Sequence, residues 1–407
     1  MSATRVAFAA VAAFGTLATA RATAQDAKVP ILTVPFTMAD EHMLVEARVD
    51  DDDAPLRFVF DTGASGTVLD EAVARRLHIE ATGSHDATGA SGSVQLRVAA
   101  GRRLRLADGA VLSDLAMVLT DLTHLSAEFD RPLAGIVGND LLRRWLTEID
   151  FTAGELRLHS FDDELPTDGW QEIAFTFGRG IRIPQFEVAV VFADGERLAG
   201  PVLFDSGAAC ALIVNQPFAE ANRVAARAGR TVEHRSQTLT APIVMLTALA
   251  GSLQVGGTQW RDVPVEIATG KQGVTGYAGY LGILDNNVIR RFDWIVDYRR
   301  KRLFCKPNAA GATPFQRPTI GASFELHDGA ITVTQVVADS PAAVAGLREG
   351  DRVVAIDDRA LGGATPATGK DVVALRKYLE QEGKVVKVAV ERDGGRRTLE
   401  WTVRSLL

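Results

Sequence analysis

Cysteine is scarce in this chain, since only Cys210 and Cys305 occur among its 407 residues. In an oxidising compartment two cysteines can pair, and closing a loop of this length would add about 4–5 kcal/mol of stability in the entropic model. The sequence does not show whether the two side chains meet in space. A disulfide and a pair of free thiols therefore both stay open.

Runs of basic residues and metal-ligand spacings are also missing. The formal net charge is −7, and no cluster of lysines or arginines resembles a phosphate-binding stripe, so nucleic acid is a poor candidate partner. The histidines show no ligand spacing, which disfavours a zinc hydrolase, and we expect neither a metal nor a cofactor. These histidines are His42, His78, His85, His124, His159, His234 and His327.

Long apolar runs are absent beyond the N-terminus. Arg5 precedes an apolar stretch at 6–20 and the small residues Ala22-Thr23-Ala24, a pattern that predicts a signal peptide over residues 1–24. The stretch is short for a transmembrane helix, and no later segment reaches the required length, so we expect no other membrane span. The protein is then exported, either to the periplasm or out of the cell. The alternative is an uncleaved membrane anchor.

The chain does contain an internal repeat. The phrase Phe60-Asp61-Thr62-Gly63-Ala64 returns as Phe204-Asp205-Ser206-Gly207-Ala208, at an offset of 205 − 61 = 144 residues. Two later landmarks return at nearly the same spacing (297 − 150 = 147): Gly135-Ile136-Val137-Gly138 matches Gly282-Ile283-Leu284-Asp285, and Glu148-Ile149-Asp150 matches Trp294-Ile295-Val296-Asp297. A nearly constant offset at three landmarks predicts two homologous lobes.

The length of the chain predicts two or three domains. Short alternating or apolar runs bounded by Gly, Asp or Pro predict β-structure for both lobes, at 28–160 and 165–306. A stretch rich in Ala, Gly and Pro predicts a linker at 307–318, and a different module follows at 319–405. Short helices are expected at 70–77 and 217–224, and others from Asn139 and from Asn286 onward.

Both parts of the chain resemble known families. On the twin Asp-Thr/Ser-Gly motifs and the segment 136–142, the first two thirds resemble the retropepsin-like and pepsin-like aspartic proteases. The tail resembles a bacterial PDZ domain, on Ser340-Pro341-Ala342, Ala345-Gly346-Leu347 and Gly350-Asp351. The resemblance implies a mainly β protein: a bilobal pepsin/retropepsin-like acid protease fold of two homologous β-barrel-like lobes, followed by a C-terminal α+β PDZ domain.

Asp61 and Asp205 are the candidate catalytic residues of an aspartic endopeptidase. Two carboxyls about 3 Å apart cannot both ionise cheaply, so they share one proton and supply both an acid and a base for hydrolysis by water. The pair titrates as a unit, which leaves the roles of the two unassigned. Because Ala64 and Ala208 supply no further hydroxyl donor, we expect a mildly acidic optimum above that of gastric enzymes.

Five neighbouring residues are expected to support the dyad. The resemblance implies that Thr62 and Ser206 brace the two loops through their hydroxyls. Gly63 and Gly207 let backbone amides approach the carboxylates, because no Cβ stands in the way. Ser65 completes this group.

The resemblance also implies two peptide-binding elements. The candidate flap tip of the first lobe is the small, Gly-rich segment Thr88, Gly89, Ala90, Ser91 and Gly92, although an ordinary hairpin turn is the alternative. In the tail, the carboxylate-binding loop corresponds to Ile320, Gly321 and Ala322, and the strand that pairs with a peptide begins at Phe324. We expect peptide or protein substrates, and protein C-termini bound by strand addition. The alternative is a tail that only caps the lobes.

One departure from the family pattern leaves a rival function open. Asp285 stands where the first lobe has Gly138, so its side chain either disturbs the packing behind the second catalytic loop or lies in a solvated turn. The rival is a catalytically degenerate peptide-binding or scaffold protein, because fold alone does not guarantee function.

Overall fold

The computed structural model describes residues 28–39, 41–88, 93–107, 109–126, 129, 131–178, 181–236, 243–362 and 365–407. The expected signal peptide, residues 1–24, lies outside this part of the chain. No helix in the described part is long and apolar enough to span a membrane.

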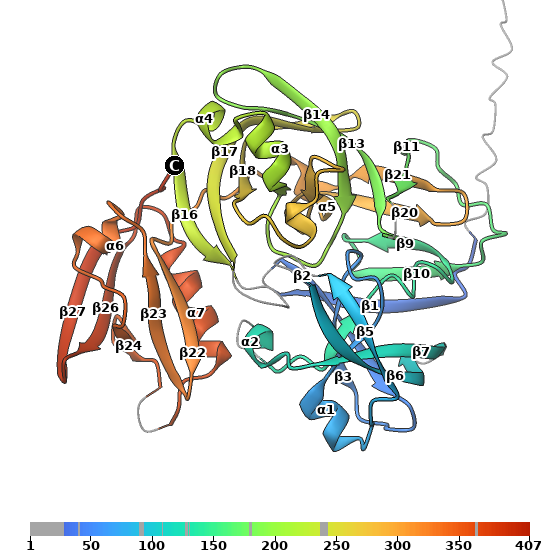
Figure 1. The fold of residues 1–407 in the computed structure, drawn as a ribbon, viewed down its shortest axis with the longest axis horizontal. Coiled ribbons are helices and arrows are strands. Elements are labelled where there is room, and N and C mark those ends of the chain that lie inside the picture. Colours follow the sequence, from blue (N-terminus) through green and yellow to red (C-terminus); the bar gives the residue numbers. More distant parts are fainter. Residues whose placement is uncertain are drawn as a thin grey trace, which may run out of the picture.

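The first lobe, which we name lobe 1, is built almost entirely of strands (blue to teal in Figure 1). Its elements are β1 (Leu32–Ala39), β2 (His42–Val49), β3 (Leu56–Phe60), β4 (Val68–Asp70), α1 (Glu71–Arg76), β5 (Gly83–Thr88), β6 (Ser93–Leu106), β7 (Ala110–Thr120), α2 (Thr123–Ser126), β8 (Gly135–Val137), β9 (Leu146–Asp150) and β10 (Glu155–His159). The burial of β7 alternates along its length, as expected for a strand with one face on the core.

Lobe 2 repeats this order (green to orange in Figure 1). Its elements are β11 (Gln171–Ala174), β12 (Thr176–Phe177), β13 (Pro184–Val191), β14 (Arg197–Phe204), β15 (Leu212–Val214), α3 (Gln216–Ala221), α4 (Val224–Ala228), β16 (Thr231–Ser236), β17 (Ile243–Val255), β18 (Thr258–Ala268), the 3-10 helix η1 (Val274–Gly276), β19 (Gly282–Leu284), α5 (Asn286–Ile289), β20 (Phe292–Asp297) and β21 (Arg302–Pro307). The repeat therefore holds at the level of elements.

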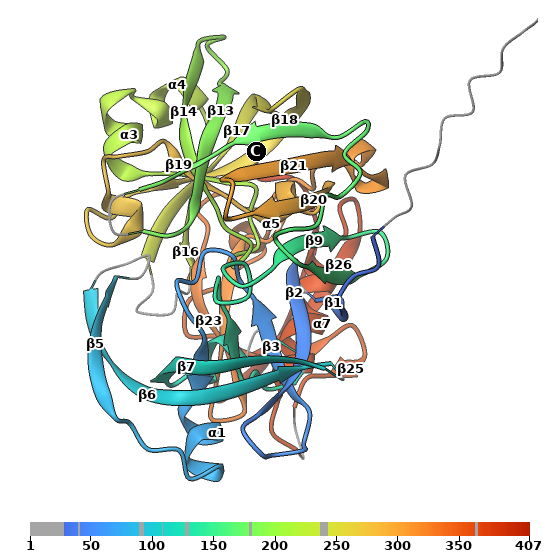
Figure 2. The ribbon, with the colours of Figure 1, turned by 90° about the vertical axis from the view of Figure 1, so that its right-hand side faces the viewer.

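A shared sheet joins the two lobes. Its order is β11-β21-β20-β9-β10-β1, with three strands from each lobe. The closing strands of the repeat meet at its centre, where Trp294 pairs with Ile149 and Val296 pairs with Thr147. Figure 2 shows β9 and β20 between lobe 2 above and lobe 1 below. The two copies of the repeat are thus locked together by a continuous antiparallel ladder.

Each copy of the Asp motif lies at the end of a buried parallel strand pair. β3 pairs in parallel with β8, and β14 pairs in parallel with β19. The Asp61 N–H donates to Val137 O at 3.0 Å, and the Asp205 N–H donates to Leu284 O at 3.0 Å. The same register therefore fixes both aspartates.

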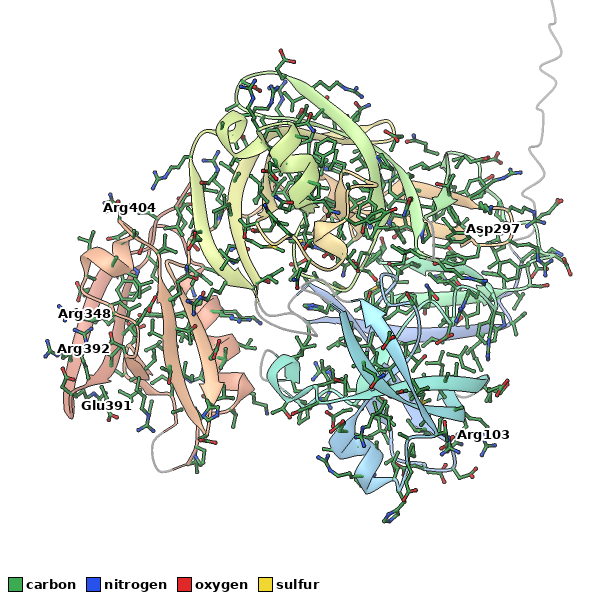
Figure 3. All side chains as sticks on the ribbon, viewed as in Figure 1. Arg103, Asp297, Arg348, Glu391, Arg392 and Arg404 are labelled. Atoms are coloured by element: carbon green, nitrogen blue, oxygen red, sulfur yellow. The ribbon has the colours of Figure 1, made fainter. Side chains whose placement is uncertain are left out.

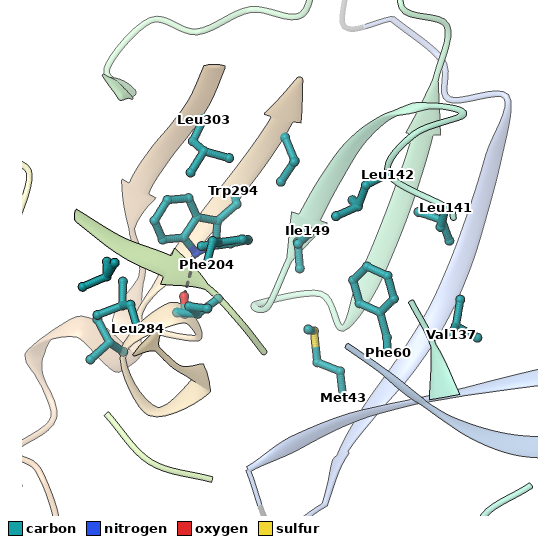
Figure 4. Close-up of a cluster of buried hydrophobic side chains, with 14 of the residues drawn as sticks. Met43, Phe60, Val137, Leu141, Leu142, Ile149, Phe204, Leu284, Trp294 and Leu303 are labelled. Carbon is teal, nitrogen blue, oxygen red and sulfur yellow. Dashed lines mark hydrogen bonds between the residues drawn. The ribbon is translucent and has the colours of Figure 1, made fainter. Parts of the chain in front are cut away.

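The phenylalanine before each aspartate anchors its loop in the core. Phe60 and Phe204 are fully buried, and Figure 4 shows them with the aliphatic side chains of their lobes and with Trp294. The Trp294 indole lies edge-on to Phe204, with ring centroids 4.9 Å apart, and donates to Ile289 O at 2.7 Å. Burying an aromatic side chain of this size contributes about 2–3 kcal/mol, so each catalytic loop rests on a rigid support.

The C-terminal module forms a separate sheet and core. Its elements are β22 (Ala322–His327), β23 (Ala330–Val336), α6 (Pro341–Val344), β24 (Arg352–Ile356), β25 (Arg359–Ala360), α7 (Gly369–Leu379), β26 (Val385–Arg392) and β27 (Gly395–Thr402). β22 is an edge strand of this sheet. On the face away from the lobes, Arg392 holds the buried Asp351 through two hydrogen bonds of 2.6 Å (Figure 3).

The segment that we expected to be a linker is packed against lobe 2, with a short 3-10 helix η2 (Ala309–Ala312). Phe315 is buried, and the Arg291 guanidinium lies 3.6 Å from the centre of its ring. Trp260 donates to Gly311 O at 2.9 Å. The connection is therefore a fixed one rather than a flexible tether.

One local expectation turns out differently in the structure, and one question that the sequence left open is answered. Residues 139–144 form turns instead of the expected helix, because β9 begins at Leu146, directly after one helical turn closed by Arg143 N–H to Asn139 O at 3.0 Å. The two thiols are free: Cys305 is buried in β21 and Cys210 follows the second Asp motif.

Candidate active site

The two aspartates face each other between the lobes. Each carboxyl affects the pKa of the other. Each lies over the glycine of the opposite loop, because a Cβ on Gly63 would be 2.1 Å from Asp205 Cγ and a Cβ on Gly207 would be 2.4 Å from Asp61 Cγ. Only glycine leaves room for the carboxyls at these two positions, and the structure brings Asp61 and Asp205 together there.

Thr62 and Ser206 join the two loops by four hydrogen bonds. Thr62 Oγ1 donates to Phe204 O at 2.9 Å and accepts from Ser206 N–H at 3.0 Å. Ser206 Oγ donates to Phe60 O at 3.2 Å and accepts from Thr62 N–H at 3.1 Å. Both hydroxyl residues are fully buried. Each loop therefore satisfies the backbone of the other.

Backbone amides hold the carboxylates unequally. Asp61 Oδ1 accepts from Gly63 N–H at 2.7 Å and from Ala64 N–H at 3.1 Å. Asp205 Oδ1 accepts from Gly207 N–H at 2.9 Å. Ser65 has an exposed side chain and lines the cavity around the two aspartates. No hydrogen bond of the described residues joins it to either carboxyl.

The environment of the pair favours retention of one proton. Burial and the facing Asp205 carboxyl raise the pKa of Asp61 well above its usual value, and burial also raises the pKa of Asp205. The backbone donors act in the opposite direction, because they stabilise the charged form. Two buried carboxyls in contact therefore bind a proton at pH values where an exposed aspartate has lost it.

A second pair of braces, which we did not expect from the sequence, crosses between the lobes. Asn139 Nδ2 donates to Arg182 O at 3.1 Å, and Asn286 Nδ2 donates to Glu41 O. Both asparagines are fully buried and occupy the same position of the repeat. Their shared place after the Gly-Ile segment was the only sequence signal, and it did not show which backbone groups they reach.

Asp285 neither disturbs the second loop nor lies in a solvated turn. Its side chain is fully buried. It accepts from Ala208 N–H at 3.2 Å, from the Cys210 thiol at 3.5 Å and from Asn286 N–H. The missing glycine of the second lobe is thus replaced by a hydrogen-bonded carboxyl.

A cavity of about 1980 Å³ surrounds the dyad. On the side of lobe 1 its wall includes Val68, Val118 and the carboxyl of Asp114. The wall of lobe 2 includes His234 and Glu266, whose Nε2 and Oε2 lie 2.7 Å apart. The cavity is large enough for an extended peptide, and both of its walls combine apolar and polar side chains.

Residues 45–141 match the aspartyl protease family, and residues 318–403 match the PDZ domain family. The chain combines an aspartyl protease domain with a C-terminal PDZ domain. A search of curated proteins finds no match. The aspartyl protease match includes Asp61 and ends before lobe 2, so the second half of the site rests on the repeat and on the contacts above.

The predicted flap of the protease domain is only partly visible. β5 and β6 pair as far as Thr88 and Ser93, so a hairpin does rise at this position beside the cavity. Gly89, Ala90, Ser91 and Gly92 lie outside the described residues. The flap therefore stays a prediction.

The predicted peptide-binding residues of the PDZ domain lie partly on the same cavity. Ile320, Ala322 and Phe324 line it, and Phe324 also packs into the PDZ core. Gly321 instead fits closely against the cap of α6, because a Cβ there would lie 2.6 Å from Ser340 Oγ. The free edge of β22 and the catalytic dyad thus open into one space.

A glutamine fixes the PDZ domain on lobe 2. Gln335 of β23 accepts from Arg235 N–H at 2.8 Å and donates to Glu233 O at 3.4 Å. These two groups belong to the outer edge of β16, the terminal strand of the lobe 2 sheet; Figure 1 shows the module beside this strand. The side-chain amide takes the place that a neighbouring strand would fill.

The described residues hold no group of three or more His, Cys, Asp or Glu side chains arranged to bind a metal ion. In the described hydrogen bonds of the two Asp loops, the polar groups are carboxyls, backbone amides and hydroxyls. These are the groups needed for acid–base chemistry on a bound water.

Proposed function

We propose that the protein is an exported aspartic endopeptidase whose water nucleophile is activated by Asp61 and Asp205. The observation that supports it most directly is the contact of the two carboxyls over Gly63 and Gly207, braced by the hydroxyls of the opposite loops. A degenerate protease has no need to preserve this mutual arrangement. The scaffold alternative becomes an outcome of the test below.

The chemistry requires one proton on the pair. The ionised carboxyl takes a proton from the water as its oxygen attacks the peptide carbonyl carbon, and the protonated carboxyl donates to the carbonyl oxygen. The tetrahedral diol then collapses: the protonated carboxyl gives its proton to the departing nitrogen as the amide C–N bond breaks, and a hydroxyl of the diol returns a proton to the other carboxyl as the product carboxyl group forms. The dyad thus again carries one proton. Activity therefore falls when the pair binds a second proton and again when it loses the first. With both pKa values raised by burial, the proposal keeps a mildly acidic optimum.

Replacing Asp61 by Asn tests the proposal. Asp61→Asn keeps the size of the side chain but removes the shared proton, so peptide hydrolysis should fall by at least about 10²-fold. Asp262→Asn is the matched control, since Asp262 is exposed, lies outside the cavity lining and has a left-handed conformation that asparagine accepts, so hydrolysis should stay at the wild-type level. Cleavage of a quenched peptide library measures both. Undiminished hydrolysis by Asp61→Asn removes the dyad, and a wild type without hydrolysis favours the scaffold.

We also propose that the PDZ domain binds the C-termini of substrates or partner proteins along β22. The family match supports peptide binding of this type, and the opening of β22 into the catalytic cavity places the bound peptide near the dyad. Export through a signal peptide at residues 1–24 is part of the same proposal. It rests on the sequence pattern alone.

A further inference from the structure

The two catalytic loops differ in length. Val68 follows Asp61 by 68 − 61 = 7 residues, whereas Ile213 follows Asp205 by 213 − 205 = 8. Val68 and Ile213 hold the same place in the fold, because each pairs with the middle residue of the Gly-Ile strand of its lobe, β8 or β19. The second loop therefore contains one extra residue.

In lobe 1 the shorter loop lies directly on the turn behind it. A Cβ on Gly138 would be 2.4 Å from Gly66 O and 2.6 Å from Ala64 O. Asn139 N–H donates to Ala64 O at 2.9 Å. No side chain fits between the loop and this turn.

In lobe 2 the Asp285 side chain fills the space that the extra residue creates. Asp285 Oδ1 accepts from Asn286 N–H, which corresponds to Asn139 N–H in lobe 1. The same oxygen accepts from Ala208 N–H, and Oδ2 accepts from the Cys210 thiol. We name this set of contacts the Asp285 bridge. In lobe 2 the Asp285 side chain accepts the hydrogen bond from Asn286 N–H, whereas in lobe 1 the backbone carbonyl of Ala64 accepts the corresponding bond.

The Asp285 bridge changes how many backbone N–H groups donate to the candidate catalytic carboxyl of lobe 2. Ala64 N–H donates to Asp61 in lobe 1. Ala208 N–H, its counterpart in lobe 2, donates to Asp285 instead of Asp205. The dyad therefore has three backbone donors where two copies of the lobe 1 arrangement would supply four.

We propose that Asp285 is a positioning residue that withholds the Ala208 N–H from Asp205 and thereby sets the pH range in which the dyad works. This inference rests on the proposed protease activity. A carboxylate with fewer N–H donors is less stabilised in its charged form, so it holds its proton to higher pH. The dyad should therefore work at a higher pH than a site with the lobe 1 arrangement in both lobes.

Several charged or titratable side chains lie around the Asp285 bridge. Those that face the catalytic pair or the bridge are His42, Asp61, Asp205, Cys210, Glu266, Tyr280 and Asp285. Burial and the nearby Asp205 raise the pKa of Asp285 well above its usual value. Burial, with Asp285, likewise raises the pKa of the Cys210 thiol. The proposed effect runs through the hydrogen bond from Ala208 N–H to Asp285, and an Asp285→Asn variant separates it from an effect of charge.

The pH profile of kcat/KM tests this role, because a merely structural contribution would lower activity at every pH without moving the limbs. Asp285→Gly frees the Ala208 N–H to donate to Asp205. The two limbs together should then move to lower pH by about one unit in total, the size of one hydrogen bond to a charged group, because the sum of the two pKa values of the pair falls by the stabilisation of one ionised carboxyl. A second variant combines Asp285→Gly with deletion of Cys210, which restores the length of the lobe 1 loop, and carries the same expectation. Asp285→Asn is the matched control: it keeps the oxygen that accepts from Ala208 N–H, so its limbs should stay at the wild-type positions.

Two results overturn the inference. One is an unmoved profile in both glycine variants that remain folded by thermal unfolding. The other is an Asp285→Asn profile displaced as far as that of Asp285→Gly, because charge would then be responsible. A wild type whose hydrolysis does not depend on Asp61 refutes the proposed function itself, and is recognised before any Asp285 variant is measured.

Discussion

Single hydroxyl groups determine how the two catalytic loops are held. Thr62 and Ser206 are fully buried and bond only to the backbone of the opposite loop among the described contacts. Buried backbone groups that lose such a partner retain the full cost of desolvation. The braces are therefore sensitive to changes that leave the size of the side chain almost intact.

Thr62→Val tests this at the residue scale. The substitution keeps the shape of the side chain but leaves Phe204 O and Ser206 N–H without their partner, so the free energy of unfolding should fall by about 1–3 kcal/mol. Thr62→Ser keeps the hydroxyl and is the matched control, with a smaller loss. Urea unfolding measures both. Equal stability of Thr62→Val and the wild type would show that the braces do not hold the loops together.

At the scale of elements, the free edge of β22 is the part of the PDZ domain aimed at the catalytic cavity. The strand has a sheet partner on one side only, β23. In the proposed binding mode, a peptide added to the other side gains a ladder of backbone hydrogen bonds, and the loop before the strand holds its C-terminal carboxylate. A negative charge placed in that loop should therefore repel the ligand.

Ile320→Asp applies this test in the full chain. The affinity for a peptide with a free C-terminus should fall at least about tenfold relative to Ile320→Asn, because the two side chains differ only in charge. The same peptide with an amidated C-terminus should not distinguish the two variants. Fluorescence anisotropy measures the Kd values. Equal affinities of Ile320→Asp and Ile320→Asn for the free carboxylate would contradict C-terminal recognition at this loop.

At the scale of the whole molecule, long-range contacts decide what the repeat alone could not. The repeat predicted both lobes and both catalytic aspartates, because each copy is a local pattern of an apolar strand followed by a glycine turn. It could not show that Asn139 and Asn286 cross to the other lobe, since their partners at Arg182 and Glu41 lie far away in sequence. Nor could it show the burial of Asp285, which depends on a one-residue difference in loop length.

The position of the PDZ domain is another such case. Composition predicted a linker at 307–318, but Phe315 is buried against lobe 2 and Gln335 binds the edge of β16. Neither contact has a local sequence signal, because both depend on surfaces that form only in the folded lobes. The PDZ domain is therefore held in a fixed position beside the cavity that contains the two aspartates.

The most direct test of the central claim is a double-mutant cycle on the two aspartates. If lobe 1 and lobe 2 form one catalytic dyad, then Asp61→Asn, Asp205→Asn and the double variant should each lose nearly the same factor in kcat, because residues that act as a unit are strongly non-additive. Measured on one peptide at the pH optimum of the wild type, the three residual rates should coincide. A single variant that keeps wild-type kcat, or losses that multiply in the double variant, would contradict the account.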